Sequence, residues 1–397
     1  MTRRSGKLPR PPQLLPVFLL PIITACSLLE PSPRIGPYTA ISLNGFSDGI
    51  NHWRNRYGSD YAKYRPEQIV EIADNVLLYQ RDNGGWVENR DPTRILNAEE
   101  KAAIAVEKTN ATGSFDNRNV YSQIEYLSAV YQQTYEPRFR AAALKGMDYL
   151  LSMQHTRCGG WPHTVPGTER YHPFITMADE VTSGVLRTLR KASTGSAPFE
   201  YLPYSVKRRA QAALERGDAC VLQLQVIQNG RLTGWAGQYD PQTLQPAQGR
   251  SFELASIVSQ ETVEMLRYLM SIPEPSPEVI RAIDSGVDWL ERSKITGWRL
   301  ETFKIDPPIK YDYHTASTDR RMVEDPAAPP LWARFYDLQD NSVVLANRDS
   351  IRVSRYADIH HERRTGYGWY GAWPAKLLDT EYPAWRQRVD RTAVAAQ

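Results

Sequence analysis

Two carboxylates and one guanidinium group recur at a similar position of a repeating pattern. Asp116, Asp179 and Arg250 each follow a Gly-Trp pair, and each stands just before or within the first turn of an expected helix. Carboxylates are ligands for a hard cation such as calcium, and guanidinium groups pair with carboxylates. A later loop adds Arg320, Arg321 and Arg334. Together with aromatic rings that can cover pyranose faces, these residue types suit an acidic polysaccharide.

Each of these residues also has a purely structural interpretation. Asp116 fits a helix N-cap, and residues 176–179 fit a capping box. An arginine beside an acidic helix start is usually a solvated ion pair. That three such residues occupy the same position of the repeat favours a role in binding or catalysis, but the pattern alone leaves both interpretations open.

Pairs of helices would position these residues. Gly-Trp turns recur at similar intervals, with an amphipathic helical pattern before each turn and a second one in each interval. The repeats are longer than tetratricopeptide and armadillo units and predict an all-α fold, an α/α toroid or incomplete α/α barrel. Helix starts would then meet at one end of the ring. The turns are Gly84-Gly85-Trp86, Gly159-Gly160-Trp161, Gly234-Trp235, Gly297-Trp298 and Gly368-Trp369.

One stretch departs from the helical pattern. Residues 299–360 hold three proline clusters and strand-like runs at 332–336 and 343–345, which predict a long irregular, partly β insertion near the C-terminus. Insertions this long are usually functional or disordered, and the aromatic and arginine content favours function. We expect a tether and irregular segment at 26–60 and a single catalytic domain over 61–397.

Residues 1–25 read as a signal peptide. Four basic residues precede an apolar run that is too short to span a bilayer. Ile23-Thr24-Ala25-Cys26 resembles a bacterial lipobox, and cleavage after a small residue without lipidation is the alternative. We therefore expect an exported protein, either a periplasmic or outer-membrane lipoprotein or a secreted one, whose membrane contact is limited to this anchor.

The charge balance excludes a generally basic surface. The basic and acidic side chains of the whole chain number 48 and 45, and four of the basic ones lie in the leader, so the remainder is close to neutral. No nucleic-acid partner is expected, and we expect a monomer. Cys158 and Cys220 are far apart in the sequence, and their pairing cannot be decided without geometry, so both are expected to be small buried side chains.

Other motifs lack the context that their chemistry needs. Residues 366–371 match GxGxxG, but no strand precedes them and no βαβ unit surrounds them. None of the histidines has the spacing of a zinc site, and no P-loop or GxSxG elbow occurs.

Five ordered motifs between about Tyr61 and Trp385 resemble those of the family 10 polysaccharide lyases, pectate lyases of toroidal α-helical fold. The motifs are Ser114-Phe115-Asp116-Asn117 with Gln123, Ile175-Thr176-Met177-Ala178-Asp179-Glu180, Arg250-Ser251-Phe252-Glu253-Leu254-Ala255-Ser256 with Glu261, Trp332-Ala333-Arg334-Phe335-Tyr336-Asp337 with Asn347-Arg348-Asp349, and Gly366-Tyr367-Gly368-Trp369-Tyr370.

The resemblance implies calcium-dependent β-elimination of polygalacturonate, which yields 4,5-unsaturated oligogalacturonides. It implies Asp116 and Asp179 as catalytic calcium-site carboxylates and Arg250 as the base that removes the C5 proton. Residues expected to bind substrate are Arg320, Arg334, Glu253, Tyr367 and Trp369. Because the pKa of arginine exceeds about 12 in solution, we expect Ca²⁺ and neighbouring guanidinium groups to lower it and the activity to have an alkaline optimum.

The sequence departs from the family pattern beside the expected cation site. Arg118-Asn119-Val120-Tyr121 replaces a Gly-Ala-Thr-Thr-like stretch, and Ala178 replaces an asparagine. Two other functions stay open on the residues alone. One is a glycoside hydrolase that uses Asp116 and Asp179 as acid and base on a uronic-acid polysaccharide. The other is a lipoprotein that binds uronides without turnover.

Overall fold

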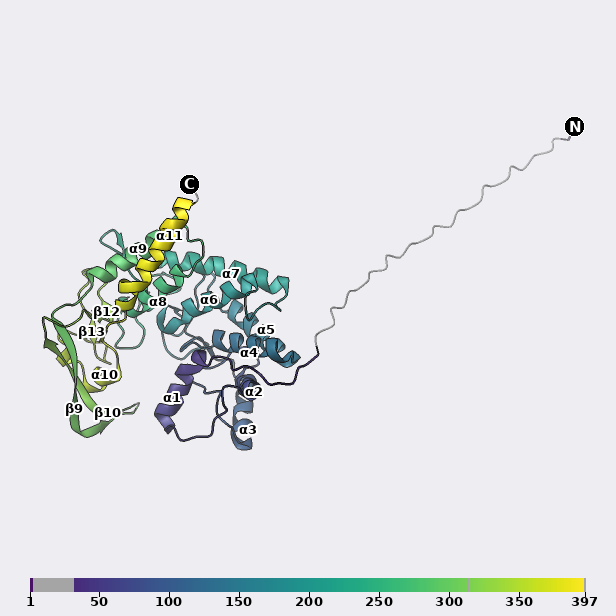
Figure 1. Cartoon of the computed structure of the whole chain (residues 1–397), viewed down its shortest axis with the longest axis horizontal. Coiled ribbons are helices and arrows are strands. Elements are labelled where there is room, and N and C mark those ends of the chain that lie inside the picture. Colours follow the sequence, from purple (N-terminus) through teal and green to yellow (C-terminus); the bar gives the residue numbers. More distant parts are fainter. Residues whose placement is uncertain (3–31, 313, 396–397) are drawn as a thin grey trace. The chain divides into compact units, whose positions relative to one another are not determined.

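The computed structural model describes residues 1–2, 32–312 and 314–395 (Figure 1). The predicted cleavage site and the lipobox at Cys26 lie outside these residues. Residues Pro33–Gln397 form one compact unit, which carries every feature discussed below. Within the described ranges, no helix has the length and apolarity needed to cross a bilayer.

The unit is mostly helical, with small sheets between the helices. Over the described residues its α-helices are α1 (Ser47–Tyr57), α2 (Ile69–Tyr79), α3 (Ala98–Val106), α4 (Tyr121–Thr134), α5 (Pro137–Ser152), α6 (Val181–Thr194), α7 (Tyr204–Gln223), α8 (Ser259–Met270), α9 (Pro277–Arg292), α10 (His361–Gly366) and α11 (Tyr382–Ala395).

The helices pack as pairs in two layers, as the repeat predicts. Helices α4 and α5, α6 and α7, and α8 and α9 form successive pairs. The first members contact one another in the order α2, α4, α6, α8, and the second members in the order α5, α7, α9. In Figure 1 the blue pair α4 and α5 lies beside the teal pair α6 and α7. The loops that precede the first-layer helices therefore follow one another along the structure.

A buried tryptophan begins each of these loops. Trp86, Trp161 and Trp235 are at most 1% exposed. Each indole N–H donates to a carbonyl of the preceding helix, that of Val76 at 2.8 Å, Leu150 at 2.9 Å or Val221 at 2.8 Å. A buried indole needs such an acceptor. This contact fixes the loop against the end of the helix.

The fourth Gly-Trp turn is not part of this series. Trp298 is 41% exposed and begins a strand. Its expected place is taken by Trp332, which is 1% exposed and donates to the Leu290 carbonyl at 2.8 Å. The repeat continues, but the segment between Gly297 and Trp332 forms an excursion inside it, so the assignment of Gly297-Trp298 to the series was wrong.

That excursion is a long antiparallel hairpin. Strand β9 (Trp298–Lys310) pairs with β10 (Thr315–Glu324). Pro307 and Pro308 do not end the strand as expected. They lie at a register shift, where residues 305–308 face a single residue of β10. In a two-stranded ribbon both strands are edges, which tolerate proline. The insertion is therefore more regular than the prolines indicated.

Short strand pairs join the loops of successive repeats. Antiparallel pairs form between β1 and β2, β3 and β6, β8 and β12, and β11 and β15. The short strands are β1 (Gly113–Ser114), β2 (Thr164–Val165), β3 (Ile175–Thr176), β4 (Ile227–Gln228), β5 (Arg231–Leu232), β6 (Gln238–Tyr239), β7 (Pro246–Ala247), β8 (Ile257–Val258), β11 (Trp332–Ala333), β12 (Phe335–Tyr336), β13 (Leu345–Ala346), β14 (Arg352–Val353) and β15 (Tyr370–Gly371). These pairs hold the loops together as one surface.

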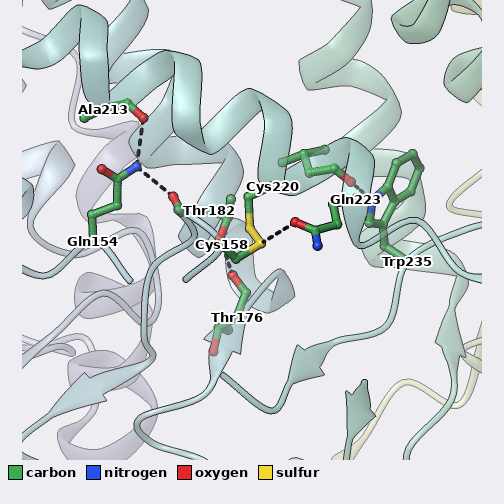
Figure 2. The surroundings of a disulfide bond; sticks show 10 residues. Gln154, Cys158, Thr176, Thr182, Ala213, Cys220, Gln223 and Trp235 are labelled. Carbon is green, nitrogen blue, oxygen red and sulfur yellow. Dashed lines mark hydrogen bonds between the residues drawn. A yellow bond between two sulfur atoms is a disulfide. The ribbon is translucent and has the colours of Figure 1, made fainter. Parts of the chain in front are cut away.

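A disulfide joins Cys158, in the loop after α5, to Cys220 on α7 (Figure 2). Nearby, the Gln154 amide donates to the carbonyls of Gly159 and Ala213, both at 2.8 Å. The disulfide and the hydrogen bond to Ala213 each tie the loop after α5 to α7, the next helix of the second layer. The sequence left this pairing open, and geometry decides it.

Candidate active site

The loops before the first-layer helices meet in one cavity of about 170 Å³. Asp116 precedes α4, Asp179 precedes α6 and Arg250 precedes α8, and all three line this cavity. The convergence expected from their shared phase is therefore present. Other charged or polar groups in the wall are Glu88, His163, Tyr171, His172, Gln238, Glu253, Ser256, Glu261, Arg334 and Tyr367.

Asp116 is a buried carboxylate without a capping role. Helix α4 begins after Val120 and receives no side-chain cap, so the N-cap interpretation is wrong. The Asp116 side chain is 16% exposed, and its Oδ1 lies 3.5 Å from His163 Nε2 without accepting a hydrogen bond. Burial raises the pKa of Asp116, but His163 and the charge of Arg250 outweigh it and hold the pKa below its usual value.

Asp179 lies in a short 3-10 turn, Ala178–Glu180, with a left-handed φ of 52°. Helix α6 receives no side-chain cap either, so the expected capping box does not form. Burial, and then the charge of Asp116, raise the pKa of Asp179 to about 6. The two carboxylates thus repel each other across the cavity, and the His163 ring lies 3.5 Å from Asp116.

Arg250 is held by a carboxylate and a phenol. Its Nη2 lies 2.5 Å from Glu253 Oε1, which also accepts a 2.6 Å hydrogen bond from the Tyr367 hydroxyl. The Arg250 side chain is 45% exposed, so its partial burial lowers its pKa less than the Glu253 charge and hydrogen bond raise it, and the pKa lies well above its usual value. In return, the pKa of buried Glu253 falls to about 2, mainly through Arg250. The lowering of the Arg250 pKa that we expect from bound Ca²⁺ stays a prediction.

Arg334 provides the second guanidinium of the cavity. It lies between β11 and β12, 3.0 Å from the buried Glu261 carboxylate and 4.7 Å from the centre of the Tyr367 ring. Its buried Nε has no hydrogen-bond partner. Burial raises the pKa of Glu261 to about 7, against the charge of Arg334. Arg334 thus keeps donor capacity for an anion in the cavity.

Two predicted substrate-binding residues, Arg320 and Trp369, do not line the cavity. Arg320 on β10 donates to the Tyr367 carbonyl at 3.2 Å and lines a neighbouring hollow with His314. Trp369 is 1% exposed, and its indole donates to the Arg363 carbonyl at 3.1 Å. It meets the Tyr367 ring edge to face, with the ring centroids 5.3 Å apart, and does not line the cavity, so its place gives no support to a substrate contact. Glu253 lines the cavity, but its bonds position Arg250 and Tyr367.

Sequence reasoning missed a second series of wall residues. Glu88, His163, Gly237 and Arg334 each lie two positions after a buried tryptophan of the repeat, and all four line the cavity. Only Arg334 was predicted. The signal was present in the repeat, but reading it required Trp332 in place of Trp298.

The donor set fits a divalent cation that the ligand helps to bind. Asp116 and Asp179 supply carboxylate oxygens, and Asp116 Oδ1 is buried without a hydrogen bond. A cation between two repelling carboxylates would satisfy that oxygen and remove the repulsion. Among the described residues, no group of three or more His, Cys, Asp or Glu is arranged to hold a metal. Water or ligand oxygens would therefore have to complete the shell of Ca²⁺.

Known proteins share this sequence pattern and this fold. The model of the pectic acid lyase family matches residues 80–378. A solved family 10 polysaccharide lyase from Cellvibrio cellulosa is 26% identical, with a TM-score of 0.68 over 86% of this chain and 97% of that one. A mutant family 10 lyase from the same organism, in complex with trigalacturonic acid, matches with a TM-score of 0.67 at 26% identity, over 86% and 98%. No curated protein matches the sequence.

Proposed function

The chain belongs to the pectic acid lyase family and is a polysaccharide lyase, and we propose that it cleaves polygalacturonate by calcium-dependent β-elimination. One observation carries the proposal. The two carboxylates Asp116 and Asp179 and the two guanidinium groups of Arg250 and Arg334 line a single cavity. Such a site can hold a uronate carboxylate next to both a cation site and a candidate base.

The reaction removes the C5 proton of a uronate and breaks the C4–O4 bond, which leaves a C4=C5 double bond. Charge develops on the C5 carboxylate as the proton leaves, so the site must offer positive charge there. Asp116 and Asp179 would hold Ca²⁺, which when bound would supply positive charge beside the substrate carboxylate. Arg334, with an unpartnered Nε, would bind a carboxylate of the same or a neighbouring uronate.

Arg250 is the proposed base, as the family resemblance implies. Glu253 holds it in the charged form, so substrate and cation must offset that carboxylate before the guanidinium can lose a proton. A base works only when deprotonated, and the pKa of Arg250 is high. The rate is therefore expected to rise with pH through the alkaline range.

A glycoside hydrolase is the second candidate, because the pKa of Asp116 lies below its usual value while that of Asp179 is raised to about 6. Such a separation suits an acid and base pair. It does not account for the two guanidinium groups in the wall, and the family is a lyase family.

The architecture and location are proposals as well. The two layers of paired helices support an α/α toroid, with one catalytic domain after the tether. The Cys158–Cys220 disulfide supports export to an oxidising compartment, which is consistent with the predicted signal peptide and with the lipid anchor that the lipobox predicts.

Ultraviolet absorbance of the unsaturated product tests the proposed function. With polygalacturonate and Ca²⁺, absorbance is expected to grow with time and to grow faster at alkaline pH. A chelator should stop the growth, and an excess of Ca²⁺ should restart it. Growth of absorbance at the same rate in chelator would contradict the role of the cation.

A further inference from the structure

The two turns that carry the cavity carboxylates adopt backbone conformations that ordinary residues disfavour. After Asp116, the φ angles of Asn117, Arg118 and Val120 are 53°, 62° and 69°. In the second turn, Asp179 and Glu180 have φ angles of 52° and 58°. None of these residues is glycine, so left-handed backbone is unfavourable at each of them. Such turns persist only where surrounding contacts hold them.

One ion pair connects the two turns directly. Arg118 Nε lies 3.1 Å from Glu180 Oε1. Arg118 is two positions after Asp116, and Glu180 is one position after Asp179. Neither Arg118 nor Glu180 lines the cavity of the two carboxylates. Their effect on the site would therefore pass through the backbone of the turns.

Each partner is also anchored outside the turns. Arg118 lies 3.5 Å from Asp48 in the first turn of α1, and its Nη1 donates to the Asn44 carbonyl at 3.3 Å. Glu180 lies 3.2 Å from Arg187 on α6. With exposures of 37% and 27%, the Arg118 and Glu180 side chains are partly shielded from solvent. The pair thus links α1, the turn before α4 and the start of α6.

The attraction between Arg118 and Glu180 opposes the repulsion between the two carboxylates of the cavity. Asp116 and Asp179 line the same cavity, and two carboxylates that face one cavity repel each other when both are charged. That repulsion pushes the two turns apart, whereas the attraction between Arg118 and Glu180 pulls the same turns together. The pair needs no contact with a ligand to do this.

We propose that Arg118 and Glu180 form a brace that fixes the separation of the Asp116 and Asp179 turns, and that both are positioning residues for the site. Loss of the brace would loosen the turns without removing any group from the cavity wall. The expected loss of turnover rests on the proposed function, whereas the expected loosening of the two turns does not.

Amide hydrogen exchange of the cation-free protein tests the brace without using activity. Amides in both turns are hydrogen-bonded: Asn119 N–H donates to the Asp116 carbonyl at 3.1 Å, and Ala178 N–H donates to the Gly237 carbonyl at 3.1 Å. In Arg118→Gln, exchange over residues 113–121 and 175–182 is expected to be about tenfold faster than in the wild type. Arg118→Lys keeps the charge and should recover part of the protection.

Arg386→Gln is the matched control. Arg386 on α11 also pairs with two carboxylates, Asp284 and Asp390, and is 38% exposed, but it is not next to either turn. Its replacement should leave exchange in both segments unchanged. Unchanged exchange in Arg118→Gln, or equal acceleration in the two variants, would overturn the brace.

Turnover provides the second measurement. If the wild type is active, Arg118→Gln and Glu180→Gln should each lower kcat/KM about tenfold, and the double variant should be no worse than either single one, because the singles break the same pair. A kcat/KM within twofold of wild type for both singles would overturn the positioning role. An inactive wild type with accelerated exchange in Arg118→Gln would contradict the proposed function and leave the brace supported.

Discussion

Replacing Arg250 by alanine is expected to lower kcat by about 10²–10⁴-fold, the usual contribution of a general base, with a much smaller change in KM. The loss belongs mainly to the transition state, since the proton is transferred only there. Arg250→Lys should be nearly as slow, because lysine keeps the charge but not the planar fork that meets Glu253. The measurement is turnover at saturating Ca²⁺ and substrate across the alkaline range.

Arg321→Ala provides the control for this substitution. Arg321 lies on the neighbouring hairpin and is paired with Glu301 at 2.6 Å, but it does not line the cavity. Its kcat should stay within a factor of two of wild type. If Arg250→Ala weakened substrate binding while kcat survived, and lysine restored the binding, Arg250 would be a substrate clamp and not the base.

Replacement of either cavity carboxylate by its amide should abolish activity but change stability in opposite directions. The folded-state pKa of Asp179 is raised to about 6 from 3.8, so its charge destabilises the fold progressively as pH rises from about 4 and fully above about 6. In chelator at pH 8, Asp179→Asn is expected to raise the free energy of unfolding by on the order of 2 kcal/mol. Stability would then be gained where function is lost.

The charge of Asp116 has the opposite effect on the free energy of unfolding. The folded-state pKa of Asp116 is lowered through His163 and Arg250, so its charge contributes stability above the unfolded-state pKa, and this stability is lost as pH falls through the folded-state pKa. Asp116→Asn should therefore lower the melting temperature in chelator at pH 6, where the raised pKa of His163 keeps its ring charged. Thermal unfolding of both variants with and without Ca²⁺ measures the contrast. Stabilisation of both variants, or turnover near wild type in either, would contradict the assigned environments.

The sequence was sufficient to predict that the site residues converge, because the repeat has a simple geometry. Loops before the first-layer helices lie next to one another, so Asp116, Asp179 and Arg250 had to meet if the repeat was read correctly. The capping alternatives failed because helices α4 and α6 begin after Val120 and Glu180, without a side-chain cap.

The sequence was insufficient where a contact in three dimensions decides the role. A Gly-Trp pair begins both a buried loop and an exposed strand, so Trp298 was mistaken for Trp332. The burial of Trp369 against the Tyr367 ring follows from packing that no spacing encodes. Pairing of Cys158 with Cys220 needs the loop after α5 to lie against helix α7.

The masses of the reaction products test the central claim most directly. Elimination divides the chain without adding water, whereas hydrolysis adds one water molecule at each cleavage. Wild-type protein with polygalacturonate and Ca²⁺ is expected to release fragments with an unsaturated end, each lighter by one water than the saturated fragment of the same length. Products that are all saturated would contradict elimination at this site.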